Sequence, residues 1–134
     1  MTKKTNHKVK NAKAKGSGFE RDVLHNLQRT YPHMYLTSKQ GFVQQYDLCD
    51  DEEKVVVECK RHKSISWNQA KKWFEKLERV APEGYECLLV FKSNQQPVLV
   101  MKKLLGIGFM VFEFEQDYGV FEKHPSIRKK GGVV

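Results

Sequence analysis

Residues 54–60 read Lys-Val-Val-Val-Glu-Cys-Lys, and the rest of the fold can be built around them. Three consecutive valines predict a strand that is buried on both faces, as inner strands of α/β sheets are. Side chains alternate between the faces of a strand, so Glu58 and Lys60 are expected to project together, with Cys59 opposite. This stretch therefore predicts an inner strand that ends in a charged pair.

Helical and extended patterns alternate on either side of this strand. A helix is expected from Ser17 or Gly18 until Pro32, and a second one over residues 67–81, with Ser66 as its cap. Further strands are predicted at residues 34–38, 43–49, 85–92 and 98–102, and an edge strand at 110–114. The order indicates a mixed α/β domain, a central mixed sheet flanked by helices.

The bulk composition is that of a single globular domain. The chain has 134 residues, 40% of them hydrophobic and 11% aromatic, which supports one core and excludes a disordered chain. No apolar run approaches the roughly 18 residues of a membrane span, and no hydrophobic stretch follows the basic N-terminus as in a secretory signal. Cys49, Cys59 and Cys87 lack a CxxC spacing, so we expect reduced, buried thiols in a cytosolic protein.

The net charge of +8 lies at the two ends of the chain. Residues 1–15 hold six lysines and no acid, and residues 123–134 hold four cations and no acid, which leaves 14 cations and 16 acids between them. We therefore expect a folded domain at 17–122 between flexible basic tails at 1–16 and 123–134. Basic tails favour a polyanion partner such as nucleic acid. A solubility tail or a membrane-surface patch is the alternative interpretation.

An aspartate upstream of the valine strand suggests a metal site. Asp47 precedes the acidic turn at residues 50–53, so pairing of the two flanking strands would bring it near Glu58. Two carboxylates together repel and need a cation, and oxygen ligands suit Mg²⁺ or Mn²⁺. Such an ion polarises a phosphodiester and activates water, while Lys60 positions the water or stabilises charge. The alternative is a turn aspartate and a solvated Glu–Lys pair, but a charge after three valines is costly without a partner.

These residues resemble the PD-(D/E)xK nuclease superfamily, whose motif is an aspartate followed by Glu-x-Lys on the next strand. Within it, the chain is similar to archaeal-type Holliday-junction resolvases, which some phages also carry. The first helix begins Gly16-Ser-Gly-Phe-Glu-Arg21, which matches the Gly-x-x-Phe-Glu-Arg start in those enzymes, and residues 37–41 partly match their Ser- and Gly-containing loop. An arginine expected before the loop serine is absent here, and Lys39 is the candidate substitute.

The resemblance implies a restriction-endonuclease-like fold and a structure-selective DNA endonuclease. It implies that Glu20 joins Asp47 and Glu58 at the metal, that Arg21 contacts phosphate and that Ser38 contacts the scissile strand. It also implies a homodimer that cuts two opposed strands of a four-way junction.

Further cations and a glutamine follow the motif. Lys60-Arg61-His62-Lys63 is a basic cluster, so Arg61 and Lys63 are candidate phosphate contacts, and Gln69 on the next helix is a candidate neighbour of the site. The apolar run at 104–109 is either a dimer interface or packing on the sheet. Two alternative functions remain: another nuclease of the same superfamily, of restriction, repair or transposon type, or a basic nucleic-acid-binding protein without catalysis.

Overall fold

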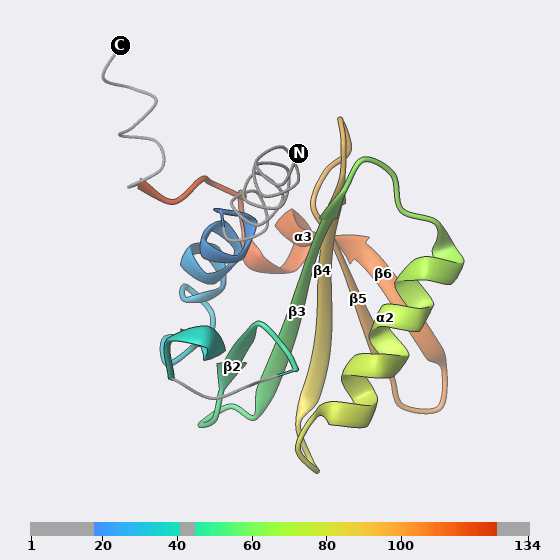
Figure 1. Cartoon of the computed structure of the whole chain (residues 1–134), viewed down its shortest axis with the longest axis horizontal. Coiled ribbons are helices and arrows are strands. Elements are labelled where there is room, and N and C mark those ends of the chain that lie inside the picture. Colours follow the sequence, from blue (N-terminus) through green and yellow to red (C-terminus); the bar gives the residue numbers. More distant parts are fainter. Residues whose placement is uncertain (1–17, 41–44, 126–134) are drawn as a thin grey trace, which may run out of the picture.

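A six-stranded mixed sheet lies between helices in the computed structural model, which describes residues 18–40 and 45–125 (Figure 1). The strands follow one another across the sheet in chain order: β1 (Tyr35–Leu36), β2 (Leu48–Asp50), β3 (Val55–His62), β4 (Glu86–Ser93), β5 (Leu99–Leu104) and β6 (Gly108–Glu113). β3 and β4 are parallel, and every other neighbouring pair is antiparallel. The predicted α/β domain with a mixed sheet is confirmed.

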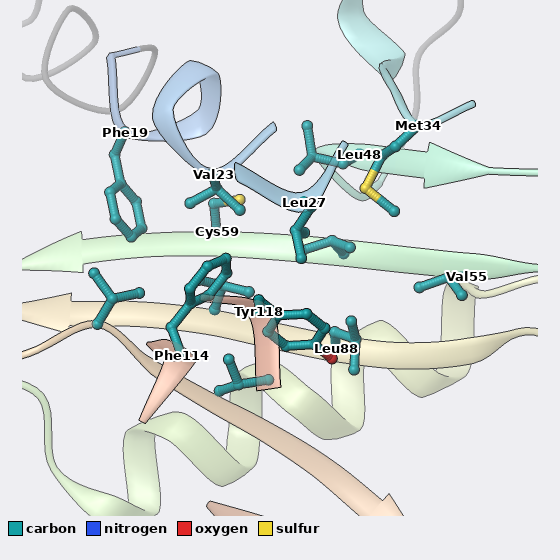
Figure 2. Packing of buried hydrophobic residues seen from close by; sticks show 14 of the residues in the cluster. Phe19, Val23, Leu27, Met34, Leu48, Val55, Cys59, Leu88, Phe114 and Tyr118 are labelled. Atoms are coloured by element: carbon teal, nitrogen blue, oxygen red, sulfur yellow. The ribbon is translucent and has the colours of Figure 1, made fainter. Parts of the chain in front are cut away.

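Helices cover both faces of the sheet. The helical residues 18–27 and the short helix α3 (Phe114–Tyr118) pack on one face, and α2 (Trp67–Val80) packs on the other while it connects β3 to β4. β3 is apolar on both sides for this reason. Val55, Val57 and Cys59 lie in the cluster under the first helix, as Figure 2 shows, and Val56 packs with Leu77 of α2.

Local sequence signals explain the bounds of α2. The Ser66 side chain accepts a hydrogen bond from the backbone N–H of Gln69 at 3.1 Å, which caps the first turn. The helix stops at Val80, two residues before Pro82, close to the predicted end. Its buried residues Ala70, Phe74 and Leu77 recur at helical spacing and face the sheet.

The two strands before β3 are shorter than predicted. The strand expected at 34–38 is confined to Tyr35–Leu36, because the chain turns at Thr37 into the 3-10 helix η1 (Thr37–Gln40). The Thr37 backbone N–H still donates to the Asp47 carbonyl at 3.0 Å, and the Thr37 hydroxyl donates to the Tyr46 carbonyl at 2.5 Å, so a side-chain bond takes the place of further backbone pairing beyond this point. The strand expected at 43–49 begins only at Leu48, and residues 43–44 lie outside the described residues.

The last two elements of the domain compare differently with the predictions. Helix α3 was not predicted, since its five residues are too few for a periodic pattern, whereas β6 is an edge strand as expected.

All three cysteines are free, with Cys49 and Cys59 buried and Cys87 half-buried. No helix within the described ranges has the length and apolar content that a membrane crossing requires.

The described chain extends three residues beyond the predicted domain end at 122. The Asn26 amide donates to the Glu122 carbonyl at 2.6 Å, and the His124 backbone N–H donates to Asp22 Oδ1 at 2.6 Å. These bonds hold the segment after α3 against the first helix. The predicted N-terminal tail at 1–16, together with Ser17, and residues 126–134 of the predicted C-terminal tail lie outside the described residues.

Candidate active site

The edge of β3 that faces β2 is only partly paired. β2 pairs with Val55, Val56 and Val57, and β3 then continues over residues 58–62 with β4 as its neighbour on the other side. The chain before β2 bends away at residues 45–47. The charged end of β3 therefore borders an opening between the two diverging segments.

Asp47 lies at the point of divergence and is held there by β3. Its backbone N–H donates to the Val57 carbonyl at 3.0 Å, and its Oδ2 accepts a hydrogen bond from the Cys59 N–H at 2.8 Å. The carboxylate thus replaces the next carbonyl of the ladder. A carboxylate that accepts a backbone N–H is fixed in position, and here it lies beside Glu58.

Glu58 and Lys60 form an ion pair on the α2 side of β3. Lys60 Nζ is 3.3 Å from Glu58 Oε2; the Lys60 side chain is 29% exposed and the Glu58 side chain is 18% exposed. Cys59 points instead into the cluster beside Val23 (Figure 2). The prediction that Glu58 and Lys60 share a face opposite Cys59 is confirmed, as is the proximity of Asp47 to Glu58.

Glu20 reaches the same opening from the first turn of the first helix. Burial first, and then the nearby carboxyls of Asp47 and Glu58, raise the pKa of Glu20 to about 8, while Lys60 opposes this rise. The pKa of Glu58 rises to about 7, again through burial first and then through Asp47. Three carboxyls from three different elements therefore interact around one lysine.

The donor set suits a hard divalent cation by its chemistry. All three groups offer oxygen, and Lys60 does not neutralise them, since two of the carboxyls keep raised pKa values beside it. Within residues 18–40 and 45–125, no three His, Cys, Asp or Glu side chains are arranged as ligands of one ion. A bound cation would have to draw the carboxylates together, displacing the protons that Glu20 and Glu58 otherwise retain.

A small pocket adjoins this cluster on the α2 side. It has a volume of about 90 Å³ and is lined by Gln45, Glu58, Lys60, Trp73, Lys76 and Leu77. Sequence reasoning did not single out Trp73 or Lys76 as site residues. They lie about one helical turn apart on α2, and this spacing is the sequence signal that both border the same surface.

The other predicted contact residues lie around the site without lining this pocket. Arg21, Ser38, Lys63 and Gln69 are exposed, and Arg61 is exposed on the face of Cys59, opposite Lys60. Lys39 lies in η1, but its side chain is outside the described part. The structure thus brings together Glu20, Asp47, Glu58 and Lys60, and it leaves Arg21, Ser38, Arg61, Lys63 and Gln69 outside the lining of the pocket.

Comparison with family models, with curated proteins and with solved structures gave no match for this chain. Its function is therefore inferred from the chemistry and geometry of the site, together with the motif resemblance in the sequence.

Proposed function

We propose that this chain is a Mg²⁺-dependent endonuclease that hydrolyses phosphodiester bonds in DNA. The observation that supports this most directly is the convergence of Glu20, Asp47 and Glu58 beside Lys60, with Asp47 held by the Cys59 N–H at 2.8 Å. A cluster of half-buried acids, in which Glu20 and Glu58 have raised pKa values next to one cation, is typical of a functional site. The PD-(D/E)xK-like motif supports this proposal, and from the mixed sheet with parallel β3 and β4 we infer a restriction-endonuclease-like fold.

Each residue has a distinct role in the proposed reaction. Glu20, Asp47 and Glu58 hold Mg²⁺, with Mn²⁺ as the alternative ion; once bound, it would supply Lewis acidity and lower the pKa of water. Lys60 presents its ammonium to the attacking water or to a phosphate oxygen, where negative charge develops. The pocket of about 90 Å³ has room for roughly three waters, so the nucleophile fits beside Glu58 and Lys60.

We propose a four-way DNA junction as the substrate and a homodimer as the active form. One Glu/Asp/Glu/Lys set cuts one strand, and junction resolution needs two symmetric cuts, which a twofold dimer supplies. Exposed Arg21, Ser38, Arg61 and Lys63, with Lys39, contact the DNA backbone near the site.

The test uses labelled four-way junctions and matched linear duplexes, each incubated with the protein in Mg²⁺ or in EDTA. We expect paired cuts in opposed strands of the junction in Mg²⁺, no cuts in EDTA, and sparing of the linear duplex. Equal cleavage of both DNAs would point to a general nuclease of restriction, repair or transposon type. Tight binding without cleavage in any divalent ion would instead indicate a non-catalytic nucleic-acid-binding protein.

A further inference from the structure

Trp73 contacts two basic side chains of β3 at once. Lys60 Nζ lies 5.3 Å from the centroid of the Trp73 ring, and the His62 ring stacks on the same tryptophan with centroids 5.0 Å apart and planes inclined by 28°. Lys60 and His62 are two residues apart on the strand and therefore project on the same side, toward α2. The half-buried indole is a common support for both side chains.

An aromatic support differs from an acidic one in its effect on charge. A carboxylate that held Lys60 would neutralise it, whereas the face of an indole attracts an ammonium through its quadrupole and leaves the full positive charge. Glu58 already takes one side of Lys60 at 3.3 Å. Trp73 adds a second contact that restricts the long lysine side chain without further neutralisation, so its charge remains available to an anion.

We propose that Trp73 is a positioning residue that holds Lys60 and His62 in line so that they contact neighbouring phosphates of one DNA strand. The inference rests on the proposed function and deepens it by assigning the phosphate contacts on the α2 side of the site. A strand rises roughly 3.3 Å per residue, so side chains two positions apart match the order of spacing between successive phosphates. Lys76, across the pocket, adds a further cation to the same surface.

The neighbouring tryptophan provides a matched control. Trp67 lies on the same helix, is 53% exposed, and makes an edge contact with Phe109 at 6.3 Å, away from Lys60. Trp67→Leu therefore makes the same chemical change without removing the proposed support. Trp73→Phe is the conservative variant, because it keeps an aromatic face for the cation.

A double-mutant cycle on DNA affinity tests whether Trp73 acts through Lys60. Affinity for a fluorescently labelled four-way junction is measured in EDTA, so that no cleavage occurs. Trp73→Leu is expected to weaken junction binding roughly fivefold. In a protein that already carries Lys60→Ala and His62→Ala, the same substitution should weaken binding little further. Trp73→Phe should retain most of the wild-type affinity. Trp67→Leu should leave the affinity unchanged in both backgrounds. Thermal unfolding of each variant confirms that it is folded.

A spectroscopic measurement checks the stack without DNA. In a Trp67→Phe background the emission comes from Trp73, and His62→Ala should change its intensity because a stacked ring is removed. Two outcomes would overturn this inference while leaving the proposed function in place. One is that the affinity losses of the Trp73 and Lys60/His62 substitutions are additive although the wild-type protein cleaves junctions. The other is that Trp73 emission does not change in His62→Ala. A wild-type protein without affinity for DNA would overturn the proposed function as well.

Discussion

At the scale of single residues, the site depends on a backbone hydrogen bond that a side chain has taken over. Asp47 Oδ2 accepts the Cys59 N–H, which would otherwise face the opening without a strand partner. This bond orients the carboxylate next to Glu58. A buried backbone N–H needs an acceptor in any case, so the same contact satisfies the backbone of β3 and positions a proposed metal ligand.

The first prediction is that Asp47→Asn, Glu58→Gln and Lys60→Ala each lower the cleavage rate by a factor on the order of a hundred or more, because each removes a ligand or a stabilising charge. Junction binding by the two carboxylate variants should persist or tighten, since negative charge near phosphate is lost. Single-turnover rates on labelled junctions measure the effect. Glu75→Gln, an exposed acid on α2, is the control, and near-wild-type cleavage by any of the three would remove that residue from the mechanism.

The second prediction concerns pH and stability in EDTA. The pKa of Glu20 rises to about 8 and that of Glu58 to about 7, from an ordinary value of 4.5, mainly through burial. Between these ordinary and raised pKa values, the folded protein therefore binds more protons than the unfolded chain. The stability that the protonated Glu20 and Glu58 carboxyls contribute is fully present below pH 4.5 and is lost as the pH rises through 7 and 8. Melting temperatures in EDTA should fall with increasing pH, and Mg²⁺ should restore stability most at the alkaline end.

The matched variant for this experiment is Glu20→Gln, which cannot ionise. Its melting temperature should depend less on pH between about pH 5 and pH 8.5 than that of the wild type. An identical slope for the two proteins would show that Glu20 is not the group responsible.

At the scale of elements, two connections position the site. β2 and β3 pair for three residues each and then diverge, which opens the edge of β3 where its charges begin. Helix α2 returns antiparallel to β3 and carries Trp73 and Lys76 to the other side of that opening. The orientation of α2 is fixed by its buried residues Ala70, Phe74 and Leu77, which face the sheet. The packing of this buried face therefore also fixes where the helix forms the wall of the pocket.

The third prediction tests the start of α2. Ser66→Ala removes the acceptor for the Gln69 N–H and should lower the free energy of unfolding by about 1 kcal/mol. Denaturant unfolding measures the change, with the exposed Ser64→Ala as control. Equal stability of the two variants would mean that the cap contributes nothing measurable.

At the scale of the whole molecule, apolar side chains gather at the tip of the β5–β6 hairpin. Leu105 is fully exposed and Ile107 is 80% exposed, and both lie at the far edge of the sheet from the opening beside β3. Leu105 and Ile107 are thus exposed, whereas Leu104 and Gly108 belong to the paired strands and Phe109 packs on the α2 side, so the interpretation as packing on the sheet holds for part of this run. In the proposed homodimer, contact through an apolar tip at this edge would leave the candidate site accessible to the proposed DNA substrate.

The fourth prediction is that the protein is a homodimer through this hairpin. Leu105→Asp with Ile107→Asp should convert it to a monomer, because two charges would have to be buried. Light scattering of the free protein and of its junction complex measures the assembly. The monomeric variant should nick single strands and lose paired cutting. Val120→Asp, at another exposed apolar position, is the control, and a wild type that is monomeric in both states would contradict the dimer.

Sequence periodicity was sufficient for the parts that depend on near neighbours. The valine run identified β3, alternation placed Glu58 and Lys60 on one face, and the Ser66 and Pro82 signals bounded α2. These features follow from the geometry of one strand or one helix, in which residues two or four positions apart meet whatever the rest of the chain does.

Local periodicity could not predict four features: the early end of the strand at Thr37, the late start of β2, the short helix α3, and the position of Trp73 under Lys60. Each depends on groups far apart in the chain: Thr37 bonds to Tyr46, Asp47 to Cys59, and Trp73 meets a strand that precedes its helix. Such contacts arise only when the helices pack on the sheet and bring these residues within bonding distance, and no local pattern encodes that distance.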